Sequence, residues 1–398
     1  MENIRSKNTA YISTDALEQN YRAIEAILRR SRPDTPPQII ATVKANGYGH
    51  GVDTVTGVLG DAGCTFFAVS SEKEALEVRA LEEKRSRHPR ILILGYTFPE
   101  NAPAMAAADI ECAAVSPEHA KTLADGVGDG VLTIHIKLDT GMHRVGFSCD
   151  TEERAEAAVH AIADISRSPR LHIGGIFTHF ACCDDEMLDG LTPVPEGLLT
   201  EIQFARYRRV LDGLETLEIP VGLRHASNSA AILGYTPAWL DAVRAGIILY
   251  GMSPDGRPWT DNRFRPAMQL ETTVAHIQTL LPGEHVSYGA TYTADSPRTV
   301  ATLPIGYADG WIRAYTGTTV RIAGGEFPII GRICMDQCMA DITGAEEHIH
   351  AGDRVILFGG DRGESVSALA ARAGTIVYEC TCQVSARVPR VPVSGMDF

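Results

Sequence analysis

Residues 38–51 read QIIATVKANGYGHG, and this stretch decides between two ways of building a parallel sheet. Its first part, QIIATVK (38–44), is a short β-branched run, which is typical of a buried strand. The turn that follows is rich in glycine but lacks the G-x-G-x-x-G spacing that normally follows the first strand of an open, doubly wound sheet. The stretch therefore weighs against the open sheet.

Strand-like and helix-like segments alternate on both sides of this stretch, through the first 250 residues. The helical pattern is clearest in EKEALEVRALEEKR, where apolar positions recur at helical spacing. The strand candidates are residues 38–44, 66–71, 91–96, 110–116, 131–139, 172–180, 222–227 and 242–251. Strict alternation of strands and helices indicates a parallel sheet, and eight such units in roughly 250 residues match a closed barrel. We predict an α/β fold with a (β/α)8 barrel of the TIM type.

The texture of the chain changes after Gly251. Residues 253–266, SPDGRPWTDNRFRP, are rich in Pro, Gly and Asp and indicate a linker. Short strand-like runs separated by turn residues then fill residues 268–360, and one late helix is expected at 366–374. We predict two domains, a barrel over 1–252 and a C-terminal β-rich domain over 253–398.

Composition indicates a soluble enzyme with small substrates. The 398 residues are 44% hydrophobic and 22% charged, and 50 acidic against 36 basic side chains leave a net charge of −14. A chain this acidic is a poor ligand for nucleic acid or anionic lipid, so neither partner is expected. No apolar run approaches the ~18 residues of a membrane span, and the first residues lack the apolar core of a signal peptide. The nine cysteines contain no C-x-x-C pair, which favours reduced thiols in the cytoplasm and no metal site.

Function in such a barrel gathers where the strands end, so the polar residues at those positions are the candidates. Lys44 ends the first strand, where apolar surroundings would favour the free amine that a Schiff base requires. Lys137 lies inside the fifth strand, His179 ends the sixth and Arg244 interrupts the apolar eighth. Each has a structural alternative: a surface lysine, a Lys137–Asp139 pair or a satisfied structural histidine. Arg244 is the hardest to explain as core, because a buried guanidinium needs an acceptor or an anion.

A second group of residues could hold a phosphate. Asn228 and Ser229 stand where a helix begins after the seventh strand, so their side chains and backbone N–H groups could bind an anion. The structural alternative is an N-cap. Gly246 and Ile247 follow Arg244, and a glycine there permits close approach of the backbone.

The second domain contributes fewer signals. Tyr288, in VSYGATY, could be an ordinary strand aromatic, and Asp309, in GYADGW, has the setting of a turn residue. The C-x3-C pair Cys334 and Cys338 lacks histidine partners and is a weak metal signal.

Taken together, the motifs resemble those of the alanine racemase family, enzymes that use pyridoxal 5′-phosphate and are built on a (β/α)8 barrel. The motifs occur in the family's order across both domains. They are VKANGYGHG, KLDTGMHRVGF, GIFTHFA, HASNSA, VRAGIILYG, VSYGATY, LPIGYADGW, GRICMDQ, TIVYE and RVPRV. The resemblance implies interconversion of L-alanine and D-alanine by two bases, one on each face of Cα.

The resemblance assigns the chemistry to two residues. Lys44 is similar to the lysine that binds the cofactor as a Schiff base and acts on the D-face. Tyr288 is similar to the tyrosine that acts on the L-face and reaches the site from the partner subunit. A homodimer with shared active sites is therefore expected.

The resemblance also assigns supporting roles. Arg244 resembles the arginine facing the pyridine nitrogen, and Arg144 the arginine near the cofactor phenol oxygen and the substrate carboxylate. Lys137 matches a lysine that is often carbamylated and steadies that arginine. The set resembling the family's other cofactor contacts is Tyr48, His179, Asn228, Ser229, Gly246, Ile247 and Tyr378. The remaining matches are Met335 for the substrate carboxylate, Tyr307 as a gate of the access channel, His225 in the network linking Tyr288 to Arg244, and Asp336 as support.

Some positions depart from the family pattern, and other functions compete. His143 stands where a small residue is common, Val377 precedes Tyr378 where Asn is frequent, and the tail continues past RVPRV. A decarboxylase on the same plan would place an acidic group at the pyridine nitrogen, which Arg244 argues against. A non-catalytic pyridoxal phosphate carrier would leave residues 267–398 unexplained. A broader racemase acting on serine stays open, as do D-alanine biosynthesis for peptidoglycan precursors and D-alanine breakdown.

Overall fold

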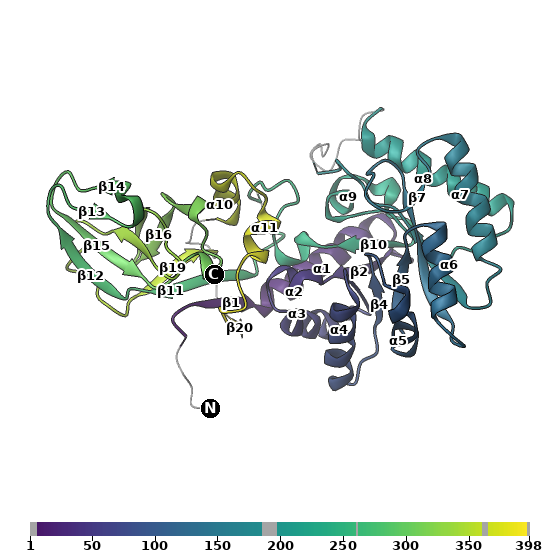
Figure 1. The fold of residues 1–398 in the computed structure, drawn as a ribbon, viewed down its shortest axis with the longest axis horizontal. Helices are drawn as coiled ribbons and strands as arrows, with labels where there is room; N and C mark the ends of the chain where they lie inside the picture. The colour runs from purple at the N-terminus through teal and green to yellow at the C-terminus, as the bar shows by residue number, and fades with distance from the viewer. Residues whose placement is uncertain (1–5, 185–196, 260–261, 360–364, 396–398) are drawn as a thin grey trace. The chain divides into compact units, whose positions relative to one another are not determined.

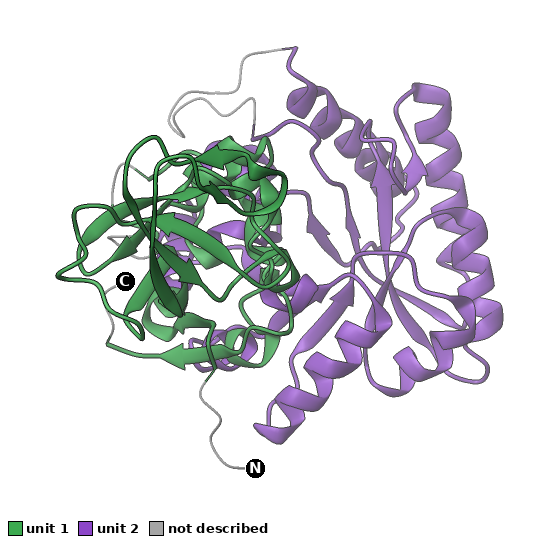
Figure 2. Ribbon diagram, turned by 60° about the vertical axis from the view of Figure 1, so that its left-hand side comes forward, with its two compact units in different colours: residues 1–19, 48–55, 250–398 green, residues 20–47, 56–249 purple. Residues whose placement is uncertain are grey.

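The structure is a computed structural model that describes residues 6–184, 197–259, 262–359 and 365–395. The chain forms two compact units, coloured separately in Figure 2. One contains residues 20–47 and 56–249, and the other contains residues 1–19, 48–55 and 250–398. Within the described residues, no helix is long and apolar enough to cross a membrane.

The first unit is a closed parallel barrel with helices on its outer side (Figure 1). Its strands pair in the order β5-β4-β3-β2-β10-β9-β8-β6, and β5 pairs with β6 to close the ring. Their bounds are β2 Gln38–Thr42, β3 Phe66–Val69, β4 Arg90–Ile93, β5 Glu111–Ala114, β6 Leu132–Asp139, β8 Leu171–Phe177, β9 Leu223–His225 and β10 Ala242–Ala245. The short strand β7, Phe147–Ser148, pairs with the end of β6. The predicted barrel is confirmed, and each of the eight strand candidates overlaps one of its strands.

Helices follow the strands because the connecting segments carry capped, apolar-striped sequences. Ser71, Ser116 and Thr151 accept hydrogen bonds from backbone N–H groups in the first turns of α4, α6 and α7. The helices are α1 Thr14–Ser31, α2 Lys44–Tyr48, α3 Val52–Asp61, α4 Glu72–Lys84, α5 Ala102–Ala107, α6 Pro117–Gly126, α7 Glu152–Ile165, α8 Leu199–Thr216 and α9 Ser229–Gly234.

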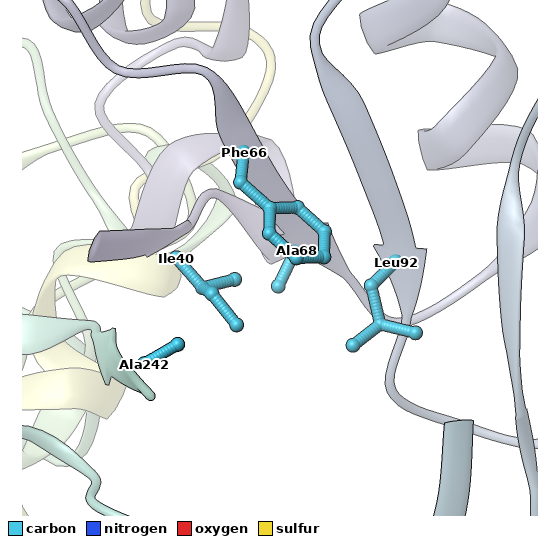
Figure 3. Close-up of a cluster of buried hydrophobic side chains, with 5 residues drawn as sticks. All are labelled: Ile40, Phe66, Ala68, Leu92 and Ala242. Atoms are coloured by element: carbon cyan, nitrogen blue, oxygen red, sulfur yellow. The ribbon is translucent and has the colours of Figure 1, made fainter. Parts of the chain in front are cut away.

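Part of the barrel interior is apolar. Figure 3 shows five buried side chains from β2, β3, β4 and β10 that point toward one another: Ile40, Phe66, Ala68, Leu92 and Ala242. A barrel of eight strands is just narrow enough for side chains to fill. The opposite wall, made by β5, β6, β8 and β9, carries buried polar side chains beside the apolar Ala113 and Phe177. We call it the polar wall, and its residues are described below.

The second unit is built on a mixed sheet of nine strands in the order β12-β15-β18-β17-β16-β19-β11-β1-β20. Their bounds are β1 Thr9–Ser13, β11 Met268–Thr273, β12 His276–Leu280, β15 Arg298–Leu303, β16 Thr319–Ile322, β17 Gly325–Ile330, β18 Cys338–Asp341, β19 Arg354–Phe358 and β20 Arg390–Val393. A small hairpin, β13 (His285–Val286) with β14 (Tyr292–Thr293), and two helices, α10 (Val366–Ala373) and α11 (Val377–Cys382), complete it. The β-rich second domain is confirmed and the expected late helix is α10, but the expectation of only one late helix was wrong, because VYECTC (377–382) forms α11.

Strand β1 is the main surprise in this sheet. It pairs in antiparallel fashion with β11 and in parallel with the edge strand β20, so the N-terminal segment lies between two strands of a sheet made otherwise from residues after 267. Its sequence, TAYIS, is too short and too mixed to mark a strand without knowledge of its partners.

Candidate active site

Lys44 lies two residues after the end of β2 and opens a strained turn. Ala45, Asn46, Gly47 and Tyr48 all have positive φ angles, between 51° and 62°, so the chain makes a left-handed turn here. For residues other than glycine this costs energy, and such strain gathers at functional sites. The carboxylate of Glu74 holds the turn by accepting hydrogen bonds from the N–H of Ala45 (2.7 Å) and from Ser70. Lys44 is thereby fixed, half-buried, at the C-terminal end of a barrel strand, which we call the barrel mouth together with the other strand ends.

Arg244 is the most constrained side chain of the barrel mouth. It is 3% exposed, and its Nη1 donates to the Nδ1 of His225 (2.8 Å) and to the carbonyl of His225 (3.0 Å). Its Nη2 donates to the carbonyls of Thr178 (2.6 Å) and Ala226 (2.9 Å) and lies 3.3 Å from the Nδ1 of His179. Burial lowers the pKa of Arg244 to about 10, which still leaves it charged at neutral pH. The four terminal hydrogens are used inside the barrel, so Nε–H is the donor that remains to face a ligand.

Both histidines beside Arg244 are held neutral. Burial, followed by the charge of Arg244, lowers the pKa of His179 and of His225 well below the ordinary value. The ring of Phe177 stacks on His225 at 4.8 Å with an interplanar angle of 6°, which fixes the plane of the imidazole. Both are therefore placed as acceptors toward the guanidinium, and the structure joins the predicted residues His179, His225 and Arg244 in one cluster.

Lys137 is a buried residue rather than half of a surface pair. It is 5% exposed, and the Asp139 carboxylate instead accepts the N–H groups of Gly141 and His143, each at 3.0 Å. Burial, with the nearby charges of Arg144 and Arg244, lowers the pKa of Lys137 to about 7. A neutral amine is thus available at this position near neutral pH. Arg144 lies exposed on the loop after β6.

The predicted phosphate residues meet between α9 and β10. Asn228 caps α9, with its side-chain oxygen accepting the N–H of Ala231 at 3.0 Å, so its structural alternative holds. The Ser229 hydroxyl accepts the N–H of Gly246 at 2.9 Å, which joins the start of the helix to the end of the strand. Ile247 opens the short 3-10 turn that follows. The hydroxyl and the adjacent backbone N–H groups form the donor set that an anion needs.

Three tyrosines gather in the second unit. The rings of Tyr48 and Tyr250 stack at 4.9 Å, and those of Tyr48 and Tyr378 lie 6.0 Å apart. Burial and then the neighbouring Tyr378 raise the pKa of Tyr48, so its phenol stays protonated and can donate. Gly49 lets the backbone next to Tyr48 approach α11 closely, because a Cβ on residue 49 would lie 2.1 Å from the carbonyl oxygen of Thr381.

Tyr288 lies in a turn and not in a strand. It opens the 3-10 turn Tyr288–Ala290 after β13 and is 72% exposed. Ser287 before it has a φ of 65° and donates from Oγ to the carbonyl of Arg332 at 2.5 Å. We refer to residues 287–290 and 334–337 as the sheet loops. They line one open groove, whose walls include Tyr288, Cys334, Met335 and Asp336.

Hydrogen bonds from residues 307–308 and from Arg387 hold the sheet loop 334–337 in place. The N–H groups of Tyr307 and Ala308 donate to the carbonyls of Cys334 (3.1 Å) and Met335 (3.0 Å). Arg387 donates to Asp336 at 2.8 Å and lies 3.5 Å from the buried Asp309, a turn residue as expected. The backbone is thus fixed while the side chains of Met335 (53% exposed) and Tyr307 (43%) stay open.

Sequence reasoning missed several residues that the structure adds to these clusters. Glu74 anchors the Lys44 turn, and Tyr250 stacks on Tyr48. On the polar wall of the barrel, Arg90, Glu111 and His135 continue the hydrogen bonds of His225. Alternation in IHIK, which puts His135 on the same face as Lys137, is the one signal that could have found any of them.

Comparisons with known proteins agree with this arrangement. The profile of the alanine racemase N-terminal domain matches residues 12–254, and that of the C-terminal domain matches residues 267–392. Curated proteins named alanine racemase are 36% identical over 392 residues in Clostridium novyi (97% of this chain, 95% of the relative) and 38% identical over 388 residues in Desulforamulus reducens (96% and 98%).

Solved structures show the same relationship. Alanine racemase of Clostridium difficile 630 superposes with a TM-score of 0.87 at 34% identity, covering 99% of this chain and 97% of that one. The alanine racemase of Bacillus anthracis with bound L-Ala-P gives a TM-score of 0.85 at 30% identity, covering 98% and 96%. The chain belongs to the alanine racemase family.

Proposed function

We propose that this chain interconverts L-alanine and D-alanine with pyridoxal 5′-phosphate, the cofactor of its family. The observation that carries the proposal is the barrel mouth itself, where Lys44 ends one strand and the buried guanidinium of Arg244 lies on the adjacent one. The relatives named above are alanine racemases, which favours alanine over the broader alternative that includes serine.

The residues present fit the cofactor. The amine of Lys44 would hold its aldehyde, and Arg244 Nε–H would face its ring nitrogen. The donors for its phosphate would be Tyr48, Ser229, Gly246, Ile247 and Tyr378, and Arg144, His179 and Asn228 would complete the surroundings. When bound, pyridoxal phosphate delocalises the negative charge left on Cα after proton loss.

Arg244 sets the character of the reaction. A carboxylate beside the ring nitrogen would keep that nitrogen protonated and draw more charge onto the ring. A guanidinium has donors and no acceptor, so it keeps the nitrogen unprotonated. Negative charge would then stay closer to Cα, and Arg244 would thereby favour return of the proton to Cα over transamination and over the decarboxylase alternative.

Two groups would move the proton. Lys44 Nζ takes or returns it on the D-face of Cα, and the Oη of the partner subunit's Tyr288 does so on the L-face. Arg144 and the partner subunit's Met335 would hold the substrate carboxylate, with Asp336 behind Met335. Tyr307 would line the access channel.

A homodimer would supply both groups to one site. The barrel part (1–252) would contribute Lys44, and the β-rich part (253–398) of the other subunit would contribute Tyr288. The exposure of Tyr288 and Met335 on a backbone that is rigidly braced supports this, because such side chains are presented for contact with another surface.

Mixing two inactive variants tests the shared site. In a dimer of Lys44→Ala with Tyr288→Phe, one site carries both defects and the other is intact. Equal mixing and re-association should restore about a quarter of the wild-type turnover, since half of the dimers are mixed and each has one good site. If each subunit uses its own Tyr288, no activity returns, and the shared-site proposal fails.

Lys137 would carry a carbamate that forms an ion pair with Arg144. With its pKa near 7, the amine is neutral often enough to attack carbon dioxide, forming an N–C bond and releasing one proton. The carbamate is an anion and would pair with Arg144. A ¹³C resonance from labelled bicarbonate that disappears in Lys137→Met would support this, and its absence from the wild type would contradict it.

We also propose a cytoplasmic location and a role in D-alanine supply for peptidoglycan precursors. Cys64, Cys112, Cys149, Cys338 and Cys380 are buried free thiols, which suits a reducing compartment.

A panel of L-amino acids in deuterated water tests the substrate. Alanine should lead both in deuterium uptake at Cα and in loss of optical rotation. Equal rates with serine would restore the broader alternative.

A further inference from the structure

A continuous chain of hydrogen-bonded side chains runs through the polar wall of the barrel. Arg90 and Glu111 open β4 and β5, and they form a bidentate pair at 2.6 and 2.9 Å. Glu111 is 2.7 Å from the Nε2 of His135, whose Nδ1 is 2.8 Å from the Nε2 of His225. The Nδ1 of His225 is 2.8 Å from Arg244. The chain thus spans the barrel from the N-terminal ends of its strands to the mouth.

The two ends of this chain determine the proton positions between them. Arg244 can only donate, so Nδ1 of His225 must accept and its Nε2 must carry the hydrogen. That hydrogen is donated to Nδ1 of His135, which leaves Nε2–H of His135 to donate to the Glu111 carboxylate. Each imidazole is therefore neutral and protonated at Nε2. The three hydrogen bonds from Arg244 through His225 and His135 all donate toward Glu111, and Arg90 donates to Glu111 from the other side.

Electrostatics support the same arrangement. Burial would raise the pKa of Glu111, but the hydrogen bonds from His135 and Arg90 outweigh it, so the pKa is lowered and the group stays a carboxylate. Burial lowers the pKa of His135 despite the opposing Glu111. We conclude that His135 and His225 are both neutral and lie between the Glu111 carboxylate and the Arg244 guanidinium.

The backbone is shaped to admit this chain. Strand β8 carries two consecutive glycines beside His135, and a Cβ on Gly175 would lie 2.4 Å from the His135 ring. A Cβ on Gly174 would lie 3.6 Å from a Glu111 oxygen and 2.5 Å from Thr133. The register between β6 and β8 also shifts between Ile134 and His135. The glycines leave the space that the imidazole occupies.

We infer that Glu111 is a positioning residue for Arg244, acting through the tautomers of His135 and His225. The carboxylate obliges both rings to protonate Nε2, which keeps Nδ1 of His225 an acceptor and holds the guanidinium with Nε–H toward the mouth. In the reversed tautomers, His225 would present Nδ1–H to Nη1–H of Arg244, and two donors would face each other. The effect on turnover rests on the proposed function, whereas the tautomers do not.

Glu111→Gln tests this with minimal change of shape. The amide can present either its oxygen or its NH2 to His135, so only Arg244 still imposes a direction on the chain. The matched control is Asp241→Asn, which breaks another bidentate arginine pair of the barrel, Arg224–Asp241 at 2.7 and 2.8 Å, outside the histidine chain. Long-range ¹H–¹⁵N spectra of ¹⁵N-histidine protein report the tautomers, with signals assigned through His135→Gln and His225→Gln.

In the wild type and in Asp241→Asn, both rings should show a protonated Nε2 and a bare Nδ1. In Glu111→Gln, at least one ring should populate the other tautomer, and kcat should fall about tenfold with KM for alanine unchanged, the size usual when an outer partner that orients a histidine is removed. A wild-type ring that is charged or protonated at Nδ1 overturns the inference, as does a Glu111→Gln protein with unaltered tautomers. A wild type with the expected tautomers and no racemisation of alanine would instead contradict the proposed function alone.

Discussion

The barrel mouth and the sheet loops present their polar residues in opposite ways. At the mouth, Arg244 and Lys137 are almost fully buried, and each is surrounded by groups that fix its protonation or its orientation. On the sheet loops the backbone is equally well braced, yet Tyr288 and Met335 extend into solvent. The difference shows that the residues of the barrel mouth are held in place by their own buried contacts, whereas the side chains of the sheet loops are held exposed on a fixed backbone.

Lys44→Ala should have the largest effect, because under the proposed function Lys44 both attaches the cofactor and is one of the two bases. We expect racemisation to fall by about 10⁴-fold or more, since general acid–base catalysis alone contributes 10²–10⁴. Lys84→Ala, at the exposed end of α4, is the control and should keep wild-type turnover. Substantial activity in Lys44→Ala would show that the barrel mouth is not where the reaction takes place.

Tyr288→Phe should abolish the contribution of the sheet loops to proton exchange and leave that of the barrel mouth. Net racemisation should fall by about 10²–10³-fold in both directions, because the equilibrium constant between mirror images is one. Cofactor content should stay unchanged. In deuterated water, D-alanine should still exchange its Cα hydrogen through Lys44 without inversion, while exchange of L-alanine stops.

The control for this variant is Tyr292→Phe on the neighbouring strand β14, whose hydroxyl lies 3.4 Å from Asp341. It should exchange both isomers normally. Equal exchange of L-alanine and D-alanine by Tyr288→Phe would refute the division of the two faces between mouth and sheet loops.

Gly175→Ala should damage the barrel mouth without touching the sheet loops. The added methyl meets the His135 ring at 2.4 Å, and overpacking of this kind typically costs about 1–3 kcal/mol in the free energy of unfolding. Gly130→Ala, whose Cβ would meet its nearest neighbour at an ordinary 3.6 Å, should stay within about 0.5 kcal/mol. Denaturant unfolding measures the stability of both variants. Equal stability would show that the space beside Gly175 can accept a methyl group.

Lys137→Met should change how stability depends on pH. The folded-state pKa of Lys137, about 7, lies below its ordinary value of 10.5, so between these values the unfolded chain binds more protons. The contribution of Lys137 to stability therefore rises with pH across this window and is lost as pH falls toward 7. In buffer free of carbon dioxide, the wild type should gain stability relative to Lys137→Met between pH 7 and pH 9. If the difference in stability between the two proteins stays constant from pH 7 to pH 9, burial does not lower the pKa of the Lys137 amine.

Much of the barrel could be predicted because its strands are local apolar runs separated by helical patterns. The mouth residues could be predicted for the same reason, since Lys44, His179 and Arg244 stand at or near the ends of such runs. Tyr288 and Met335 could be identified through family resemblance, but neither strand pattern nor spacing shows that they are exposed. Their exposure depends on the turn at Ser287 and on the bonds from residues 307–308, which join segments distant in sequence.

The remaining features depend on contacts that no local pattern contains. Arg90 and Glu111 are first residues of strands, where charged side chains usually meet solvent, and only barrel closure brings Glu111 to His135. Similarly, Tyr250 looked like part of an apolar strand, but it lies in the 3-10 turn after β10 and stacks on Tyr48.

Strand β1 has a consequence for the order in which the molecule is made. Thr9–Ser13 emerges from the ribosome long before its parallel neighbour, Arg390–Val393. Barrel strands meet most of their neighbours within a few dozen residues, whereas the pairing of β1 with β20 must wait until residues 14–389 have been made. Until then β1 is an unsatisfied template that other chains could extend, so nascent or C-terminally shortened molecules should be the ones most prone to aggregate.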